Sequence, residues 1–143
     1  MIRDVLLLQK REMGAKLSEK YVERDAGAKM SAGIINVIIG PRRAGKSCFA
    51  LHTLRKTGNF GYVNFDDEKL VEVENYDEII DAINSIYGSP KFLLFDEIQN
   101  LSRWELFVNR LQRQGYNLVI TGSNSNLLSR ELATHLTGRF LPI

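Results

Sequence analysis

The chain has 143 residues, of which 44% are hydrophobic and 25% charged, and its formal net charge is +2. These values are typical of one folded domain with a proper core, and so small a net charge gives no general electrostatic reason to bind nucleic acid or a membrane. A single cysteine, Cys48, excludes an internal disulfide framework, and with only His52 and His135 beside it there is no zinc-ligand pattern.

The first segment, residues 1–30, is predicted to be an N-terminal helical segment packed on the core. Apolar residues recur at near-helical spacing from Leu6 to Tyr21. The run Val5–Leu8 is too short for the core of a signal peptide, and no apolar run approaches the length of a transmembrane helix. We therefore expect a cytoplasmic protein that makes no contact with a membrane.

The segment around residues 34–55 is predicted to be a strand, a glycine-containing loop and a helix. Its loop fits G-x-x-x-x-G-K-[ST], the phosphate-binding motif, in the strand–helix context that the motif requires. The glycines allow the backbone N–H groups to surround a phosphate, and the helix adds its positive end. The expected phosphate contacts are Gly40, Pro41, Arg42, Arg43, Ala44, Gly45, Lys46, Ser47 and Cys48.

Two residues of this motif carry particular chemistry. The ammonium group of Lys46 is expected to reach the outer phosphates, and the hydroxyl of Ser47 to bind Mg²⁺.

If a nucleotide binds here, Tyr21–Asp25 has two interpretations: part of a helix that packs against the sheet edge, or a segment near the base or a neighbouring subunit.

A second strand is predicted over Phe60–Phe65, followed by the acidic cluster Asp66–Glu68. Ligands of open α/β sheets bind where strands end. Asp66 or Asp67 could therefore cap the next segment or contact a metal ion or the attacking water. A helix over Tyr76–Tyr87 follows, and Gly88 is expected to end it.

The next strand, Lys91–Phe95, is apolar enough to be buried on both faces, and it ends in Asp96 and Glu97. Together with the phosphate loop, this pattern is typical of a Walker B element. We expect Asp96 to hold Mg²⁺ and Glu97 to orient the water that attacks the γ-phosphate. The chain lacks Asn-Lys-x-Asp, the base-reading motif of GTPases, which favours ATP.

An amphipathic helix is predicted over Trp104–Gln114, with Ser102 as its N-cap and Glu105 completing a capping box. Its arginines, Arg110 among them, are most simply a solvated face, with contact to nucleic acid as the alternative. Gly115 is expected to end it.

The strand Asn117–Ser123 follows, and then a helix around residues 127–136 and a short strand over residues 140–143. Ser123 or Asn124 is expected to sense the γ-phosphate, and either could instead cap the following helix. Arg139 comes after the turn residue Gly138. We expect it at the reacting edge as an arginine finger, with a surface arginine as the alternative.

As a set, these motifs resemble archaeal-type AAA-like ATPases of the additional-strand, catalytic-glutamate class, from about Ile34 onward. The resemblance implies an α/β fold: a P-loop NTPase three-layer sandwich with a five-stranded parallel sheet, in which the strand around Ile120 lies between those around Val37 and Leu94. Residues 31–143 would form the ATPase core. The resemblance also implies a continuation into a winged-helix region, so we expect this chain to be a fragment of a longer protein.

Two functions follow. In the first, the chain is a Mg²⁺-dependent ATPase in which Lys46, Glu97, Ser123, Asn124 and Arg139 are catalytic, and Arg139 acts on its own or a neighbouring site. In the second, it is a nucleotide-regulated switch or DNA-associated scaffold with little hydrolysis. Its binding surface would then be sought at Arg42, Arg43, Arg110 and Arg113. A nucleotide kinase is a weaker third interpretation, and the expected partners are ATP, the missing region, DNA or a protein, and further copies in an oligomer.

Overall fold

The computed structural model describes residues 1–18, 35–41, 45–123 and 138–142, the last of these by their backbone alone. In chain order, the elements are α1 (Ile2–Ser18), β1 (Ile35–Ile39), α2 (Lys46–Arg55), β2 (Phe60–Asn64), α3 (Glu68–Val71), α4 (Asp77–Tyr87), β3 (Phe92–Asp96), the short 3₁₀ helix η1 (Ile98–Asn100), α5 (Trp104–Arg113), β4 (Asn117–Gly122) and β5 (Gly138–Pro142).

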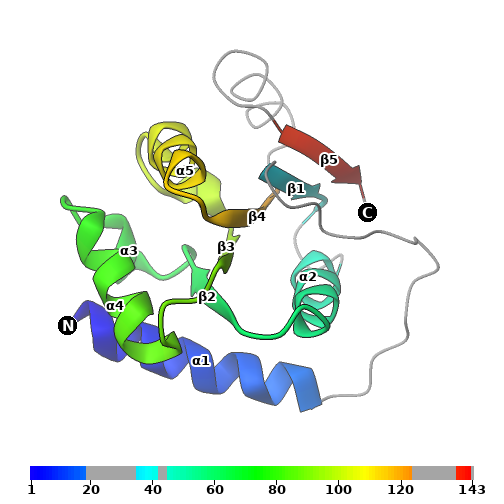
Figure 1. The fold of residues 1–143 in the computed structure, drawn as a ribbon, viewed down its shortest axis with the longest axis horizontal. Coiled ribbons are helices and arrows are strands. Elements are labelled where there is room, and N and C mark those ends of the chain that lie inside the picture. Colours follow the sequence, from blue (N-terminus) through cyan, green and yellow to red (C-terminus); the bar gives the residue numbers. More distant parts are fainter. Residues whose placement is uncertain (19–34, 42–44, 124–137, 143) are drawn as a thin grey trace.

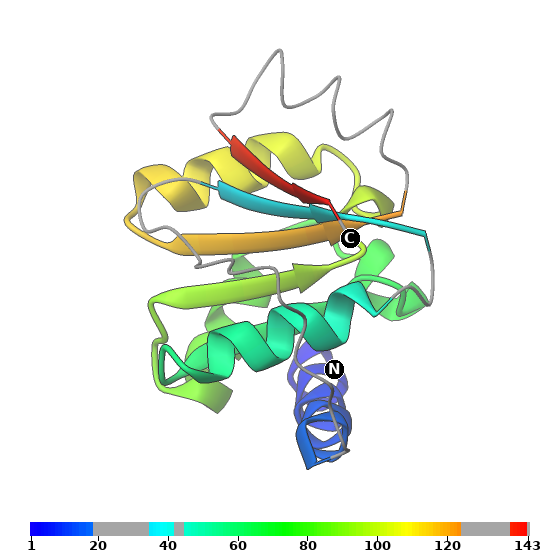
Figure 2. The ribbon, with the colours of Figure 1, turned by 90° about the vertical axis from the view of Figure 1, so that its right-hand side faces the viewer.

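The core of the molecule is a parallel sheet with strand order β2-β3-β4-β1-β5. Side chains are described for β1 to β4, and β5 pairs with the outer side of β1. The strand arrows that are visible in Figure 2 point the same way, and the pairing registers are parallel throughout. The placement of β4 between β1 and β3 is the order that the family resemblance implied, and the α/β class with a parallel sheet is as expected.

Helices cover both faces of this sheet. Figure 1 shows α2 on one face, and α3, α4 and α5 on the other. The strands are rich in Val, Ile, Leu and Phe, and almost all of their described side chains are buried, as strands covered on both faces require. Phe107 of α5 stacks on Phe95 of β3, with 5.7 Å between the ring centroids, and Phe95 also contacts Phe65 edge-on.

The first helix, α1, runs across the β2 edge of the sheet and also contacts α4 and α2 (Figure 1). Its buried residues include Leu6 and Met13, and its amide side chain Gln9 is only 5% exposed. Gln9 Nε2 donates to the carbonyl oxygen of Asn64 and Gln9 Oε1 accepts from the Asn64 N–H, both at 3.0 Å. The helix thus packs against the sheet edge, and residues 19–30 of the predicted helical segment lie outside the described part.

Two local expectations need correction. Ser102 does not cap α5: the N-cap is Arg103, in the left-handed conformation with φ 55°, and no side chain makes a capping hydrogen bond. Ser102 therefore stands one residue too early, and its carbonyl oxygen accepts from the Tyr76 hydroxyl at 2.5 Å. The last strand begins at Gly138, so Arg139 is a strand residue rather than a residue after a turn.

The helix stop at Gly88 is confirmed, because Gly88 has a left-handed φ of 72° and donates its N–H to Asn84 O. Gly115 follows α5 with φ 96°. In the described part of the chain, no helix is both long and apolar enough to span a membrane.

Candidate functional site

The candidate site lies at the edge of the sheet where the parallel strands β1, β3 and β4 end. The loop after β1 leads directly into α2, and its Gly40 N–H donates to Gly122 O at the end of β4, at 3.3 Å. Gly45 precedes α2 with φ 85°, a left-handed conformation that glycine adopts without the steric cost of a Cβ. The first turn of α2 and the tip of β3 therefore meet at one edge.

Lys46 and Glu97 form an ion pair at this edge. Lys46 Nζ lies 2.6 Å from Glu97 Oε1, and the two side chains are only 5% and 8% exposed. Lys46 is the first residue of α2, whereas Glu97 directly follows β3, so the pair connects two motifs that are far apart in the sequence. A charge pair this buried persists because each charge compensates the desolvation of the other.

The second carboxylate oxygen of Glu97 is also occupied. Gln99 Nε2 donates to Glu97 Oε2 at 2.9 Å, and Ser123 Oγ donates to the same oxygen at 3.0 Å. Gln99 Nε2 also lies 3.3 Å from Ser123 Oγ. The Glu97 carboxylate is thus held by Lys46 of α2, Gln99 of η1 and Ser123 at the end of β4.

The environment of Glu97 acts on its pKa in two directions. Burial disfavours the charged form and by itself would raise the pKa, whereas the hydrogen bonds from Lys46, Gln99 and Ser123 favour the carboxylate. The net effect is a pKa below the ordinary value of a glutamate. Glu97 is therefore a carboxylate in this arrangement at neutral pH.

The backbone of Glu97 is left-handed as well, with φ 54° and ψ 49°. This conformation is costly for a residue with a Cβ and persists where the surroundings enforce it. One such contact is visible: the Glu97 N–H donates to Thr121 Oγ1 at 3.0 Å. With this left-handed turn, the Glu97 side chain points toward Lys46, whereas the Asp96 side chain points toward Tyr62 and Thr121.

Asp96 is 2% exposed, and each of its carboxylate oxygens accepts a hydrogen bond from a hydroxyl group. Thr121 Oγ1 donates to Oδ1 at 2.6 Å, and Tyr62 Oη donates to Oδ2 at 2.8 Å. Burial, and then the charge of Asp96 and the hydrogen bond to it, raise the pKa of Tyr62, so its hydroxyl stays protonated and donates. The Thr121 hydroxyl also accepts from the Glu97 N–H, so one side chain connects both acidic residues.

The expected metal ligands fit a magnesium ion in kind. Ser47 stands in the first turn of α2 and Asp96 at the tip of β3, and both offer hard oxygen atoms of the type that Mg²⁺ takes. In the described ranges, no group of three or more His, Cys, Asp or Glu side chains could hold a metal ion by itself. This agrees with the way Mg²⁺ binds in nucleotide sites, where phosphate oxygens and water complete the shell.

Two of the expected phosphate-contact residues, Pro41 and Cys48, have no described polar contact of their side chains. Pro41 is exposed, and Cys48 is a half-buried residue in the first turn of α2. The predicted residues Arg42, Arg43, Ala44 and Asn124 lie outside the described part of the chain.

The expected place of Arg139 at the reacting edge is wrong. The register pairs Arg139 with Asn36, near the start of β1, and Pro142 with Ile39, at its end. At about 3.3 Å per residue, the Arg139 backbone lies roughly 10 Å before the strand end that leads into the phosphate loop. The Arg139 backbone therefore lies toward the end of the sheet that is opposite the phosphate loop of the same chain.

For the acidic cluster after β2, the capping alternative holds for Asp67. Asp67 Oδ1 accepts from the Lys69 N–H at 3.0 Å at the start of α3. Asp66 Oδ1 accepts from Asn100 Nδ2 at 3.0 Å, and the same amide group reaches Phe65 O at 3.2 Å. Asp66 and Asp67 thus join the end of β2 to η1 and α3.

Three residues of the site escaped the sequence analysis: Tyr62, Gln99 and Thr121. Thr121 is the one hydroxyl residue in the apolar run of β4, which was a usable signal. Tyr62 pairs in register with Leu94, two residues before Asp96, and only the parallel β2–β3 pairing brings its hydroxyl to Asp96.

Comparison with known proteins places this arrangement in a family. Residues 33–143 match the family model described as AAA domain. An uncharacterized protein of Methanocaldococcus jannaschii is 42% identical over 126 residues, which cover 85% of this chain and 28% of that protein. An uncharacterized protein of Haemophilus influenzae is 37% identical over 121 residues, covering 76% of this chain and 30% of that protein. The chain thus spans about 30% of the length of these two curated relatives.

A solved structure described as that of Rhizobiales Trip13 aligns with 99% of this chain and 57% of its own, with 13% identity and a TM-score of 0.44. A likeness at that level carries no argument about function. The family match covers most of the chain and includes both motifs that meet at the Lys46–Glu97 pair, and it points to nucleotide binding and hydrolysis in general. This chain belongs to the AAA domain family.

Proposed function

We propose that this chain binds ATP together with Mg²⁺ and hydrolyses it. The observation that carries the proposal is the meeting of Lys46, at the start of α2, with Glu97, directly beyond Asp96 at the end of β3. A phosphate chain bound by the loop would lie beside a cation, a metal-binding carboxylate and a second carboxylate for water. ATP is favoured over GTP because the sequence lacks a guanine-reading motif.

Each residue takes one part in the binding of the phosphates and the metal ion. The loop from Gly40 to Gly45 surrounds the phosphates with N–H groups, and Lys46 exchanges its contact with Glu97 for the outer phosphates. Ser47 and Asp96 would hold Mg²⁺, which when bound neutralises charge on the phosphate oxygens. Tyr62 and Thr121 keep the Asp96 carboxylate in one orientation, since each donates to a different oxygen.

The chemical step is attack of water on the γ-phosphorus, which breaks the bond to the bridging oxygen and leaves ADP and phosphate. Glu97 orients and polarises this water once Lys46 has turned to the nucleotide. Ser123 is proposed to contact the γ-phosphate or the water, which its hydrogen bond to Glu97 Oε2 supports. Asn124 is proposed for the same sensing role. Arg139 is proposed as an arginine finger for a neighbouring copy in an oligomer, since its own loop lies at the other end of β1.

A second candidate function has its own support. Because Lys46 and Glu97 neutralise each other at 2.6 Å, this pair must separate before either group can act on a nucleotide. A chain that binds ATP and hydrolyses it only after a partner separates this pair would be a nucleotide-regulated switch. A DNA-associated role has less support, because Arg110 already pairs with Asp77 at 2.6 Å.

The test is a titration of ATP with and without Mg²⁺, with phosphate release followed on the same sample. The proposal expects Mg²⁺-dependent binding with turnover, whereas binding without turnover supports the switch, and no binding contradicts both. Ser47→Ala should lose the effect of Mg²⁺ on affinity. The matched control Thr53→Ala, which removes a half-buried hydroxyl further along the same helix, should keep it.

A further inference from the structure

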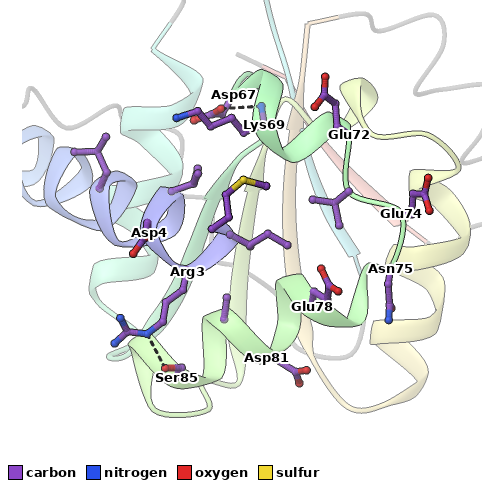
Figure 3. A pocket seen from close by; sticks show the side chains of 16 residues that line it. Arg3, Asp4, Asp67, Lys69, Glu72, Glu74, Asn75, Glu78, Asp81 and Ser85 are labelled. Atoms are coloured by element: carbon purple, nitrogen blue, oxygen red, sulfur yellow. Dashed lines mark hydrogen bonds between the residues drawn. The ribbon is translucent and has the colours of Figure 1, made fainter.

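A hollow lies outside the Lys46–Glu97 site, between the N-terminal half of α1, α3 with the segment that follows it, and α4. It encloses about 1170 Å³, and Figure 3 shows its lining seen from close by. None of the residues proposed to act on ATP lines it. The hollow is therefore a feature of the surface that ATP binding does not use.

Acidic side chains dominate the lining. Six carboxylates surround the hollow, namely Asp4, Asp67, Glu72, Glu74, Glu78 and Asp81, against the two cations Arg3 and Lys69. Figure 3 shows these carboxylates spread along its rim rather than converging on one point. Arg3 already donates from Nε to Ser85 Oγ at 3.1 Å. The region is strongly negative in a chain whose net charge is +2.

These carboxylates are not neutralised from within the described part of the chain. Among the described residues, Lys46 pairs with Glu97 and Arg110 with Asp77, and none of the six acidic residues of the hollow forms a salt bridge there. Nor do three of these acids come close enough to hold a metal ion, since the described residues contain no such group. The charge thus suits an extended cation that carries several positive groups, not a single ion.

Apolar residues also line the hollow. Ile2, Val5, Val73 and Ala82 line it between the charged groups. Leu8 also lines it, and its side chain is 55% exposed. An occupant would therefore gain from apolar side chains of its own.

We propose that this hollow, which we call the acidic groove, binds a cationic amphipathic segment of a protein partner. Lys or Arg side chains of the segment pair with the rim, and its apolar side chains cover Leu8 and its neighbours. Nucleic acid and anionic lipid are excluded as occupants, because their phosphates would face the rim carboxylates. The proposal stands independently of the ATPase function.

The probe is a fluorescent amphipathic peptide of Leu and Lys, titrated with the whole chain and followed by fluorescence anisotropy. Binding is expected, and it should weaken as salt is raised because exposed charges are screened. The double variant Glu74→Gln with Glu78→Gln should raise the Kd about tenfold, which corresponds to about 1.4 kcal/mol for the two exposed charge pairs together.

The matched control is Glu12→Gln with Glu105→Gln, which removes the same charge elsewhere. Glu78 and Glu105 each stand in the first turn of a helix, so the substitutions at these two residues are matched. The control should leave the Kd unchanged. Equal loss in both double variants, or no binding of the peptide, overturns the proposal.

Two further measurements test the apolar contact and the possibility of self-association. A peptide with Ser in place of Leu should bind several-fold more weakly; equal binding overturns the apolar part of the proposal. The second measurement is sedimentation of the chain alone. Substitutions in the groove are expected to leave its oligomeric state unchanged. Self-association that the Glu74 and Glu78 double variant abolishes would overturn the proposal, because the groove would then be an interface between copies.

Discussion

Lys46 Nζ and Glu97 Oε1 lie 2.6 Å apart, so the phosphate-loop lysine and the glutamate beyond β3 neutralise each other. A nucleotide phosphate is the natural competitor of Glu97 for Lys46, since both are anions that accept from an ammonium group. In the proposed function, nucleotide binding at this site therefore exchanges one ion pair for another. That exchange determines what each substitution at this pair should do.

Glu97→Gln should leave ATP binding intact, or tighten it, because Lys46 loses its competing anion. Phosphate release should fall about 100-fold or more, the usual contribution of a group that assists proton transfer. Titration of ATP and phosphate-release kinetics on the same variant measure both. Glu105→Gln is the control, and turnover that persists in Glu97→Gln would mean that another residue positions the water.

Acid should remove the stabilising effect of the Lys46–Glu97 pair. The folded-state pKa of Glu97 is lowered, so its contribution to the free energy of unfolding is present above its unfolded pKa and is lost as pH falls through the folded value. The difference in unfolding free energy between the wild type and Glu97→Gln should therefore shrink as the solution is acidified below the ordinary glutamate range. Urea unfolding at a series of pH values measures it, and a difference that grows toward acid would contradict this assignment.

Tyr62→Phe should destabilise the chain by about 2 kcal/mol, because it removes a hydrogen bond to the buried Asp96 carboxylate. The affinity for Mg²⁺ in the presence of ATP should also fall, since Asp96 loses one of the two groups that orient it. Tyr76→Phe is the control: its hydroxyl donates to the neutral Ser102 carbonyl, so the cost should be smaller and the Mg²⁺ affinity unchanged. Urea unfolding and Mg²⁺ titration of both variants compare them.

Thr121→Val should cost roughly 2 to 4 kcal/mol of unfolding free energy, because it leaves both Asp96 Oδ1 and the Glu97 N–H without this partner. Thr121→Ser keeps the hydroxyl and should recover most of the loss. Chemical denaturation of both variants measures this. Equal destabilisation by the two would show that packing of the methyl group, not the hydroxyl, is what matters.

Gly61→Ala should destabilise the chain by about 1 to 3 kcal/mol through overpacking. A Cβ at Gly61 would meet Ile83 Cγ2 at 2.8 Å and Leu93 Cδ2 at 3.0 Å, between β2 and its neighbours. Gly14→Ala in α1 is the control, since a Cβ there meets nothing within 4 Å. The control should stabilise by about 0.5 to 1 kcal/mol through helix propensity, and thermal unfolding of the pair compares them.

The sequence was sufficient to predict features that depend on local patterns. The strand, loop and helix around Lys46 and the buried strand that ends in Asp96 have strong periodicity and a spacing set by phosphate chemistry. The order of the strands, in contrast, came from the family resemblance, because hydrophobic periodicity does not say which strands pair.

The features that the sequence analysis missed or predicted wrongly depend on the tertiary structure. The Tyr62 hydroxyl reaches Asp96 only because β2 and β3 pair in parallel in one register, which no local pattern encodes. The predicted cap at Ser102 failed because Arg103 takes a left-handed conformation before α5, so the helix starts after a different residue. Arg139 was misplaced because β5 begins two residues earlier than predicted.

The pairing of Gln9 with Asn64 has a consequence for the solubility of the chain. β2 is the outermost strand of its side of the sheet, and its residues Phe60–Asn64 are mostly apolar. An uncovered strand of this kind is a template for edge-to-edge pairing between molecules, which leads to aggregation. Here α1 lies over that edge, and one amide side chain imitates the hydrogen bonding of an absent strand at Asn64. Removal of α1 should therefore yield not a smaller folded domain but a chain that assembles through its β2 edge.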